Sequence, residues 1–243
     1  MRSFRLFAVA VLAVLMIAFM FQPAAAVSGT LDQQQTIKSV YSSLYSSPPQ
    51  SHSQFVGETF TAGLTGFLTE VDLAIACYSQ AGASCASYGP VTVEIHSIDP
   101  TGVLLASTSL PASAIPMVGS FPLIDFVAFV FASPPAVVAG SVYAIVMTTT
   151  NAPLGSPGYE FAWSQSYSYA AGNFWFTDAT GWKQAIPTDM GDLAFKTFVT
   201  PPAAVGGFME PVNKLAIFAP WLGVIGLVGC IGTAVVVAKK RRS

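Results

Sequence analysis

Charged residues are scarce in this sequence, and basic residues most of all. Asp, Glu, Lys and Arg make up 9% of the 243 residues, and residues 27–213 contain three basic side chains, Lys38, Lys183 and Lys196. All 12 acidic residues lie in the same stretch, which therefore carries a net charge of −9 (three minus 12). Because nucleic acid and anionic surfaces repel such a stretch, we expect no nucleic-acid partner for it.

The acidic balance has two readings, solubility outside the cell and binding of a cation such as calcium. Calcium loops use a run of the Asp-x-Asp-x-Asp-Gly type, which the chain does not contain. A structural calcium ion is therefore unsupported, and we expect no cofactor and no metal.

Histidine is limited to His52 and His96. A Ser-His-acid arrangement needs a positioned histidine as its base. His52 lies in SSPPQSHSQ, which predicts a loop, and His96 alternates with Glu94 on the polar face of a predicted strand, where a paired or solvated histidine is expected. The G-x-S-x-G, H-E-x-x-H and phosphate-binding glycine motifs are also absent.

These absences predict a protein that is not an enzyme and has no catalytic residues. The remaining enzymatic alternative is a secreted hydrolase with paired carboxylates, as glycosidases have. Its candidates are Glu94, Asp125, Glu160 and Asp178, which the sequence does nothing to single out.

Cysteine occurs three times, at Cys77, Cys85 and Cys230. No second cysteine pair or nearby histidine pair completes a metal site. Cys77 and Cys85 end the segment CYSQAGASC, and in an oxidising compartment we expect them to form a disulfide, with two free thiols as the alternative. A loop this short adds about 2 kcal/mol to the free energy of unfolding.

Long apolar runs are confined to the two ends of the chain. At the start, Arg2 and Arg5 precede an apolar run over residues 6–21, and Ala24-Ala25-Ala26 follows it. This is the pattern of a secretory signal peptide over residues 1–26, cleaved after Ala26. The alternative is an uncleaved signal anchor; in either case the middle of the chain is exported.

At the other end, residues 215–238 carry no charge. At about 1.5 Å per residue they are long enough to cross a hydrocarbon core of about 30 Å as a helix. Trp221 suits the outer interface, and a basic tail over residues 239–243 is retained in the cytoplasm. The basic residues of this anchor are Lys239, Lys240, Arg241 and Arg242.

We therefore expect a single-pass protein of the cell membrane with its N-terminal domain outside the cell. The alternative is that the C-terminal segment is a sorting signal that is cut off. The preceding GGFMEPVNKLAIFAPWLG is similar to C-terminal segments of archaeal exported proteins, but it lacks LPxTG, which argues against attachment by sortase.

Short alternating stretches fill residues 54–200 and predict β-strands. In residues 67–78 and 91–97 apolar side chains alternate with more polar ones, which is typical of a sheet with one face in the core. Residues 139–150 are apolar on both faces, which indicates a central strand covered on each side. DPTG at residues 99–102 predicts a type I turn.

No amphipathic helix of ordinary length is visible in the exported part. The pattern predicts an all-β fold, an antiparallel β-sandwich over residues 54–200. We expect an N-terminal edge or linker segment over residues 27–53 and a linker over residues 201–214.

Aromatic residues gather between residues 159 and 182. Exposed Trp and Tyr can stack on sugar rings, so a carbohydrate site is one reading of this cluster. The other is that Trp163 and Trp175, which lie in predicted strands, fill the core. Tyr167, Tyr169 and Trp182 lie near turns and are the candidate ligand contacts.

Five segments occur in an order that resembles a known family. They are FVGETFTAG, TEVDLAI, VTVEIHSIDPTGVLLAS, AGSVYAIVMTT and DLAFKTFV. Together they resemble the jelly-roll-like extracellular domains of bacterial and archaeal surfaces known as choice-of-anchor domains, over about residues 54–200. The resemblance implies a β-sandwich held on a cell surface, with no enzymatic activity attached to the family.

The sequence thus predicts a non-enzymatic, surface-anchored β-sandwich that displays a binding or adhesion face for a glycan or an envelope protein. The alternative is an architectural subunit of the envelope or of an appendage, which contacts copies of itself.

Overall fold

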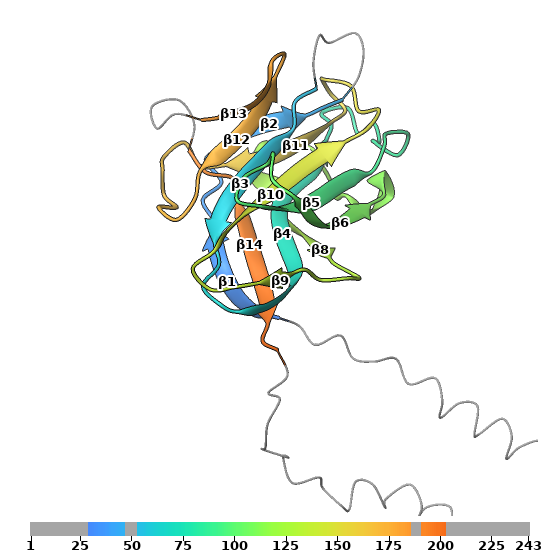
Figure 1. Ribbon diagram of the computed structural model, residues 1–243. Helices are drawn as coiled ribbons and strands as arrows, with labels where there is room; N and C mark the ends of the chain where they lie inside the picture. Colours follow the sequence, from blue (N-terminus) through green and yellow to red (C-terminus); the bar gives the residue numbers. More distant parts are fainter. Residues whose placement is uncertain (1–28, 47–52, 186–190, 203–243) are drawn as a thin grey trace, which may run out of the picture. The chain divides into compact units, whose positions relative to one another are not determined.

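The computed structural model describes residues 29–46, 53–185 and 191–202 (Figure 1). The expected signal peptide, the expected span over residues 215–238 and the basic tail lie outside these residues, as do Trp221 and His52. Within the described ranges, no helix has the length and apolar character needed to cross a membrane.

The described residues form an all-β structure of two sheets. One sheet has six strands, in the order β13 (Gly181–Gln184), β12 (Phe174–Asp178), β3 (Val56–Thr61), β10 (Val142–Thr149), β5 (Val91–Ser97) and β6 (Leu104–Leu110). All five pairings in this sheet are antiparallel.

The second sheet has eight strands and is organised around β4 (Gly66–Tyr78). Along its main path the order is β1 (Thr30–Gln35), β14 (Phe195–Thr200), β4, β11 (Gly158–Trp163) and β2 (Val40–Leu44). Three further strands pair with β4, namely β7 (Met117–Val118), β8 (Phe126–Val130) and β9 (Ala136–Val137).

The length of β4 explains this arrangement. Its first half pairs with β14 and its second half with β11. Because β8 pairs with the same β4 residues as β14, it must lie along the opposite edge of β4. The short pairing of β4 with β7 is parallel, and the other pairings of this sheet are antiparallel.

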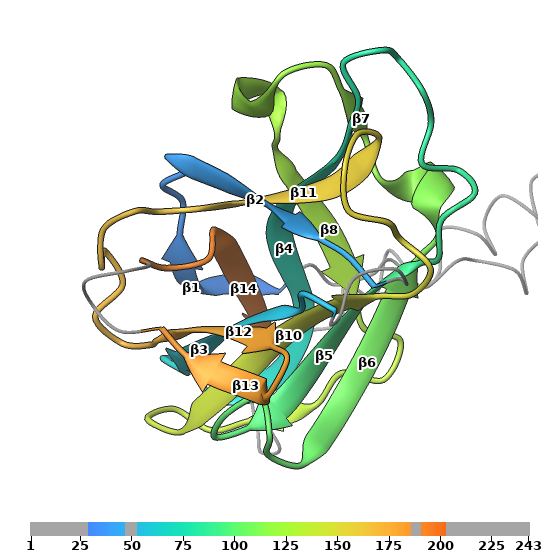
Figure 2. The same ribbon diagram turned by 90° about the horizontal axis from the view of Figure 1, so that it is seen from above.

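The two sheets face each other across one main hydrophobic core, and Figure 2 shows their strands as two layers. Both sheets contribute fully buried side chains. From the eight-stranded sheet come Leu68, Leu73, Ile75, Tyr159, Phe161 and Phe195; from the six-stranded sheet come Val56, Phe60, Ile95, Ile145 and Phe174. This is the arrangement expected of an antiparallel β-sandwich.

The predicted alternation is confirmed for residues 91–97 and for Val71, Leu73 and Ile75 of β4. At the start of β4, in contrast, Leu68 is buried and Phe67 is exposed, the reverse of a strict period of two. In β5, Val91, Val93 and Ile95 are fully buried in the core, whereas Thr92 and the other intervening residues are partly exposed. The predicted central strand over residues 139–150 is β10, which lies between β3 and β5.

Both faces of β10 are buried, as predicted, and the predicted turn supplies part of the cover. The Gly102 amide donates to the carbonyl of Asp99 at 2.9 Å, which closes a turn at DPTG. Pro100 in this turn is buried, and its Cγ atom lies 3.3 Å from where a Cβ atom of Gly57 would stand, close to Val146. The turn therefore folds over the outer face of the six-stranded sheet at β3 and β10.

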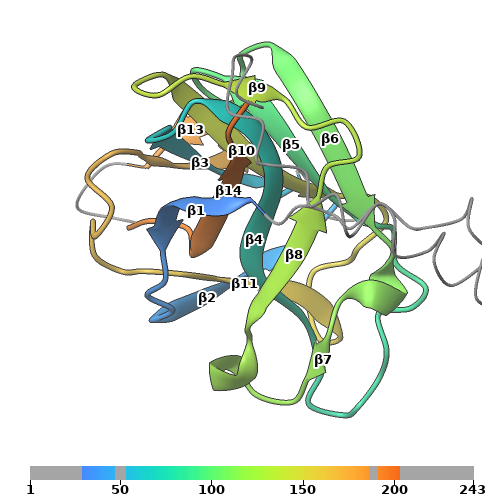
Figure 3. The ribbon, with the colours of Figure 1, turned by 90° about the horizontal axis from the view of Figure 1, so that it is seen from below.

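The folded domain begins earlier than residue 54. Residues 27–53 were expected to be an edge or linker segment, and they contribute β1 and β2, the two outermost strands on the main path of the eight-stranded sheet. Figure 3 shows β1 beside β14, where Thr30 pairs with Val199. The chain therefore enters and leaves the described domain at neighbouring positions.

A smaller apolar cluster covers the outer face of the eight-stranded sheet. Ala74 and Ala76 point to this face, and Phe121 stacks on Tyr41 and Tyr78 with ring centroids 5.2 and 4.2 Å apart. Phe121 belongs to the segment between β6 and β8, which includes the 3-10 helices η1 (Ala112–Ala114) and η2 (Phe121–Leu123). This segment therefore occupies part of that face.

Candidate functional site

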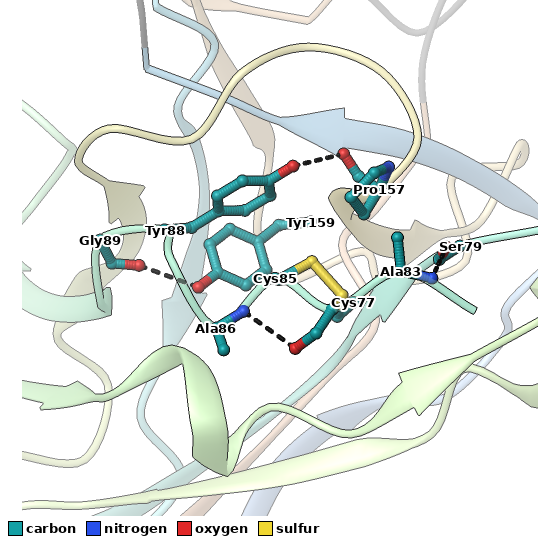
Figure 4. The surroundings of a disulfide bond; sticks show 10 residues. Cys77, Ser79, Ala83, Cys85, Ala86, Tyr88, Gly89, Pro157 and Tyr159 are labelled. Carbon is teal, nitrogen blue, oxygen red and sulfur yellow. Dashed lines mark hydrogen bonds between the residues drawn. A yellow bond between two sulfur atoms is a disulfide. The ribbon is translucent and has the colours of Figure 1, made fainter. Parts of the chain in front are cut away.

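The predicted disulfide is present between Cys77, near the end of β4, and Cys85, in the loop that leads to β5 (Figure 4). Their Cα atoms are 6.0 Å apart. Both cysteines are buried and belong to the main core cluster. The bond therefore fixes the base of the loop to the core between two consecutive strands.

Two tyrosines hold the far end of this loop against the domain. The rings of Tyr88 and Tyr159 meet edge to face, with centroids 5.8 Å apart (Figure 4). Tyr159 donates its hydroxyl to the carbonyl of Gly89, and Tyr88 donates to the carbonyl of Pro157. Burial, and to a lesser extent Tyr88, raises the pKa of Tyr159 to about 12, so its hydroxyl remains a donor at neutral pH.

The three candidate ligand contacts lie in different surroundings. Tyr169 is in the core, 8% exposed, where its hydroxyl donates to Gln33 at 3.0 Å and its ring packs edge-on against Phe195. Tyr167 is half-buried, and its hydroxyl donates to the carbonyl of Ala185. Trp182 is half-buried on the edge strand β13. Of the three, Trp182 is therefore the best placed for contact with a ligand.

Trp175 was expected to fill the core, and it faces the other way. Its neighbours on β12, Phe174 and Phe176, both pack against the core cluster. Because successive side chains of a strand point to opposite faces, Trp175 lies on the outer face of the six-stranded sheet. Trp163, in contrast, is 7% exposed at the core, where its indole donates to Ser42.

Trp175 and Trp182 lie on the same outer face of the hairpin formed by β12 and β13. Trp182 pairs with Thr177, which shares a face with Trp175. The two indoles therefore occupy diagonal positions across the pair, within reach of each other or of one shared ligand. Gln184, directly opposite Trp175, adds an exposed amide to the same face.

The other neighbour of Trp175 is a glycine, and Pro100 of the DPTG turn packs over it, with its Cγ atom 3.3 Å from where a Cβ atom of Gly57 would stand. Trp175 lies directly opposite this glycine, Gly57 on β3. The indole Nε1 of Trp175 is buried and has no hydrogen-bond partner among the described residues. We call the outer-face group of Trp175, Thr177, Trp182 and Gln184 the tryptophan face.

His96 lies on the outer face of the same sheet, as predicted, and is fully engaged. Its Nε2 atom lies 2.9 Å from Oε2 of Glu94, and its Nδ1 atom lies 3.0 Å from the carbonyl oxygen of Gly102. Both ring nitrogens therefore face oxygen atoms, and the contact with Gly102 ties the imidazole to the turn between β5 and β6.

The four carboxylates of the hydrolase alternative are held apart by separate partners. Glu94 faces His96 on the six-stranded sheet, and Asp178 closes the β12–β13 turn by accepting from the Thr180 amide. Asp125 pairs with Lys38, and Glu160 accepts from Ser43, both at the eight-stranded sheet. The burial of Glu160 raises its pKa.

Two further carboxylates lie in the core, and neither belongs to a catalytic or metal-binding sequence motif. Glu58 on β3 and Asp192, just before β14, are both 0% exposed. The position of Glu58 could have been predicted from the alternation of the strand, because Glu58 lies on the same strand face as Val56 and Phe60. In the described part of the chain, no group of three or more His, Cys, Asp or Glu side chains is arranged to hold a metal ion.

No protein-family model matches this chain, and no curated protein matches it at a significant level.

Proposed function

We propose that this protein is an exported, membrane-anchored β-sandwich of the jelly-roll-like choice-of-anchor kind, and that it binds carbohydrate outside the cell through the tryptophan face. It acts by binding, without a catalytic step. Its partners are the membrane, through residues 215–238, and a glycan of the cell envelope or of a neighbouring surface.

Export and anchoring rest on the terminal segments of the sequence and on the disulfide. A bridge between Cys77 and Cys85 suits an oxidising compartment, as found outside the cytoplasm. The order of the five family-like segments supports the jelly-roll-like topology and its place on a cell surface.

Carbohydrate binding rests on one observation, the two indoles on a common outer face. Tryptophan rings stack on the apolar faces of sugars, and adjacent amides and hydroxyls bind sugar hydroxyl groups. Trp175 and Trp182 supply the rings, while the exposed amide of Gln184 supplies hydrogen-bonding groups.

A glycan array probed with the purified protein tests this function. We expect saturable binding to a defined set of glycans that is lost in Trp175→Ala and Trp182→Ala. Phe67→Ala is the matched control, because Phe67 is an exposed aromatic residue, 44% exposed, on the other sheet. Binding that survives both tryptophan substitutions would reject the tryptophan face as the site.

Architectural self-association is the second candidate function, and strand β6 favours it. β6 is an edge strand with the sequence LLASTSL, which carries no charge and exposes Leu104 (52%) and Leu105 (40%). Uncharged edge strands pair readily with another chain. Light scattering should then detect oligomers that Ser107→Lys disrupts and that a lysine in an exposed loop, Ala81→Lys, leaves intact.

A further inference from the structure

Glu58 is a carboxylate placed inside an apolar core. It lies on β3 between Val56 and Phe60 on the inward face, and all three are 0% exposed. Its direct neighbours across the sheet, Ile145 on β10 and Phe174 on β12, are also fully buried. An ionised carboxylate in such surroundings costs several kcal/mol unless another group compensates it.

The hydrogen bonds of Glu58 satisfy only one of its two oxygens. Oε2 accepts from the backbone amide of Leu193 at 2.9 Å. Oε1 is buried and has no partner among the described residues. Oε1 lies 2.9 Å from where a Cβ atom of Gly172 would stand, so the backbone of Gly172 lies beside it.

Asp192 also has hydrogen-bond partners for only one of its two carboxylate oxygens. Its Oδ2 atom accepts from the backbone amides of Ser168 and Tyr169, at 2.6 and 2.7 Å. Its Oδ1 atom is buried and has no partner in the described part of the chain. Leu193, whose amide donates to Glu58, directly follows Asp192 in the chain, so the two carboxyl groups lie in the same part of the core.

The groups around this pair supply no positive charge within the described residues. Besides Asp192 itself, from the segment before β14, the titratable groups nearby are Tyr169, from the loop before β12, and Asp32, from β1. Each of these side chains is acidic or neutral. β10 and β12 add apolar side chains. The ion pairs found in the described ranges engage other carboxylates, those of Asp125, Glu94 and Asp72.

A single proton removes the repulsion between two buried anions and leaves one buried charge in place of two. We propose that Glu58 and Asp192 hold one proton between them at neutral pH, with Glu58 the protonated member, so that the fold is stabilised as the pH falls.

The assignment of the proton to Glu58 follows from the hydrogen bonds. Burial, and then the charge of Asp192, raise the pKa of Glu58 well above its usual value, against one opposing amide donor, Leu193. Burial also raises the pKa of Asp192, but the amides of Tyr169 and Ser168 and the Ser168 hydroxyl favour its ionised form. Asp192 therefore keeps the negative charge.

The sign of the pH effect is opposite to that of a salt-bridged carboxylate. In the unfolded chain Glu58 loses its proton near its ordinary pKa of 4.5, whereas the folded chain keeps it to higher pH. The folded state thus binds more protons, and the free energy of unfolding falls as the pH rises above about 4.5 until the folded-state pKa is passed. Below that range the contribution of Glu58 is fully present.

Urea unfolding of the purified full-length protein between pH 4.5 and 8, in the presence of EDTA, tests the proposal. Relative to Glu58→Gln, which mimics the protonated side chain, the unfolding equilibrium constant of the wild type should rise by up to about tenfold per pH unit. Asp178→Asn, which removes a carboxylate from the β12–β13 turn, should keep the wild-type slope. Equal slopes for the wild type and Glu58→Gln would overturn the proposal.

Two further measurements keep the test decisive. If Glu58→Gln does not fold, infrared spectroscopy of the wild type at pH 7 should still detect the carbonyl band of a protonated carboxylic acid, and its absence would overturn the proposal. Repeating the unfolding with calcium in place of EDTA should change nothing. A midpoint raised by calcium would show that a metal ion, and not a proton, compensates the pair.

Discussion

Gly172, in the loop before β12, lies so close to Thr59 on β3 that a Cβ atom at Gly172 would stand 1.8 Å from the Thr59 carbonyl oxygen. Real Cβ atoms do not approach backbone oxygen so closely. The amide and side chain of Thr59 in turn bond to Asn173, next to Gly172 in sequence. This contact fixes the loop that carries Tyr167 and Tyr169 to the six-stranded sheet.

Alanine at Gly172 should therefore weaken the fold. We expect Gly172→Ala to lower the free energy of unfolding by about 1–3 kcal/mol, because backbone must move to admit the methyl group. Gly119→Ala is the matched control, since nothing lies within 4 Å of its Cβ position. Urea unfolding measures both, and equal stabilities of the two variants would contradict the close contact.

Reduction of the disulfide should destabilise the domain without unfolding it. Cys77 and Cys85 are eight positions apart in the sequence, and closing so short a loop contributes about 2 kcal/mol. Thermal unfolding with and without reductant measures the difference, with free thiols counted to prove reduction. An unchanged midpoint in the fully reduced protein would refute a stabilising role, and Cys77→Ala/Cys85→Ala should be insensitive to reductant.

The Tyr159 hydroxyl should make the folded domain less stable at alkaline pH. Burial raises its pKa from the ordinary value of 10.0 to about 12 in the folded state, so the folded state keeps this proton to higher pH than the unfolded chain does. Its contribution to stability is complete below pH 10 and is lost as the pH rises through about 12. Tyr159→Phe should lack this part of the pH profile.

Loss of the same hydroxyl should also cost about 1 kcal/mol at neutral pH, because the Gly89 carbonyl loses its donor. Tyr167→Phe, which removes a half-buried hydroxyl from the carbonyl of Ala185, is the comparison. Identical alkaline unfolding of the wild type and Tyr159→Phe would rule out the proposed loss of stability at alkaline pH.

Export makes a prediction about the ends of the mature chain. Mass spectrometry of the protein isolated from its cells should find an N-terminus at Val27, after removal of residues 1–26. A retained Met1 would favour a signal anchor. The same spectrum should contain residues 215–238 if the segment is an anchor, and should lack them if it is a sorting signal.

Patterns that are local in the sequence predicted the fold well. The period of two placed the core face of β5 and of Val71, Leu73 and Ile75 in β4 correctly, and DPTG formed its turn. The disulfide was also predictable, because two cysteines near each other in a chain expected to be exported have few other partners.

Long-range pairing was beyond the reach of these patterns. β1 has the sequence TLDQQQ, which carries little apolar signal, and its partner β14 lies more than 150 residues away. Gln35 is 4% exposed and donates to the Asp192 carbonyl, so part of this strand is fixed by distant backbone. Only the folded chain reveals that residues 30–44 belong to the sheet.

The candidate site was predicted only in part, because the local sequence pattern does not fix which aromatic side chains face the core. GNFWFT has three aromatic residues in a row, so its pattern could not tell which of them point inward. The structure turns Phe174 and Phe176 to the core and Trp175 to the outer face. Tyr169, expected near the surface of a turn, is instead held inside by Gln33 and Phe195.

Co-sedimentation of the purified protein with envelope polysaccharide from its own cells tests the central claim most directly. We predict that the wild type and Phe67→Ala sediment with the polysaccharide to the same extent. Trp175→Ala/Trp182→Ala should bind at least about tenfold more weakly, the loss of about 1.4 kcal/mol or more expected when stacking rings are removed. Equal sedimentation of the double variant and the wild type, or no sedimentation of either, would contradict carbohydrate binding through the tryptophan face.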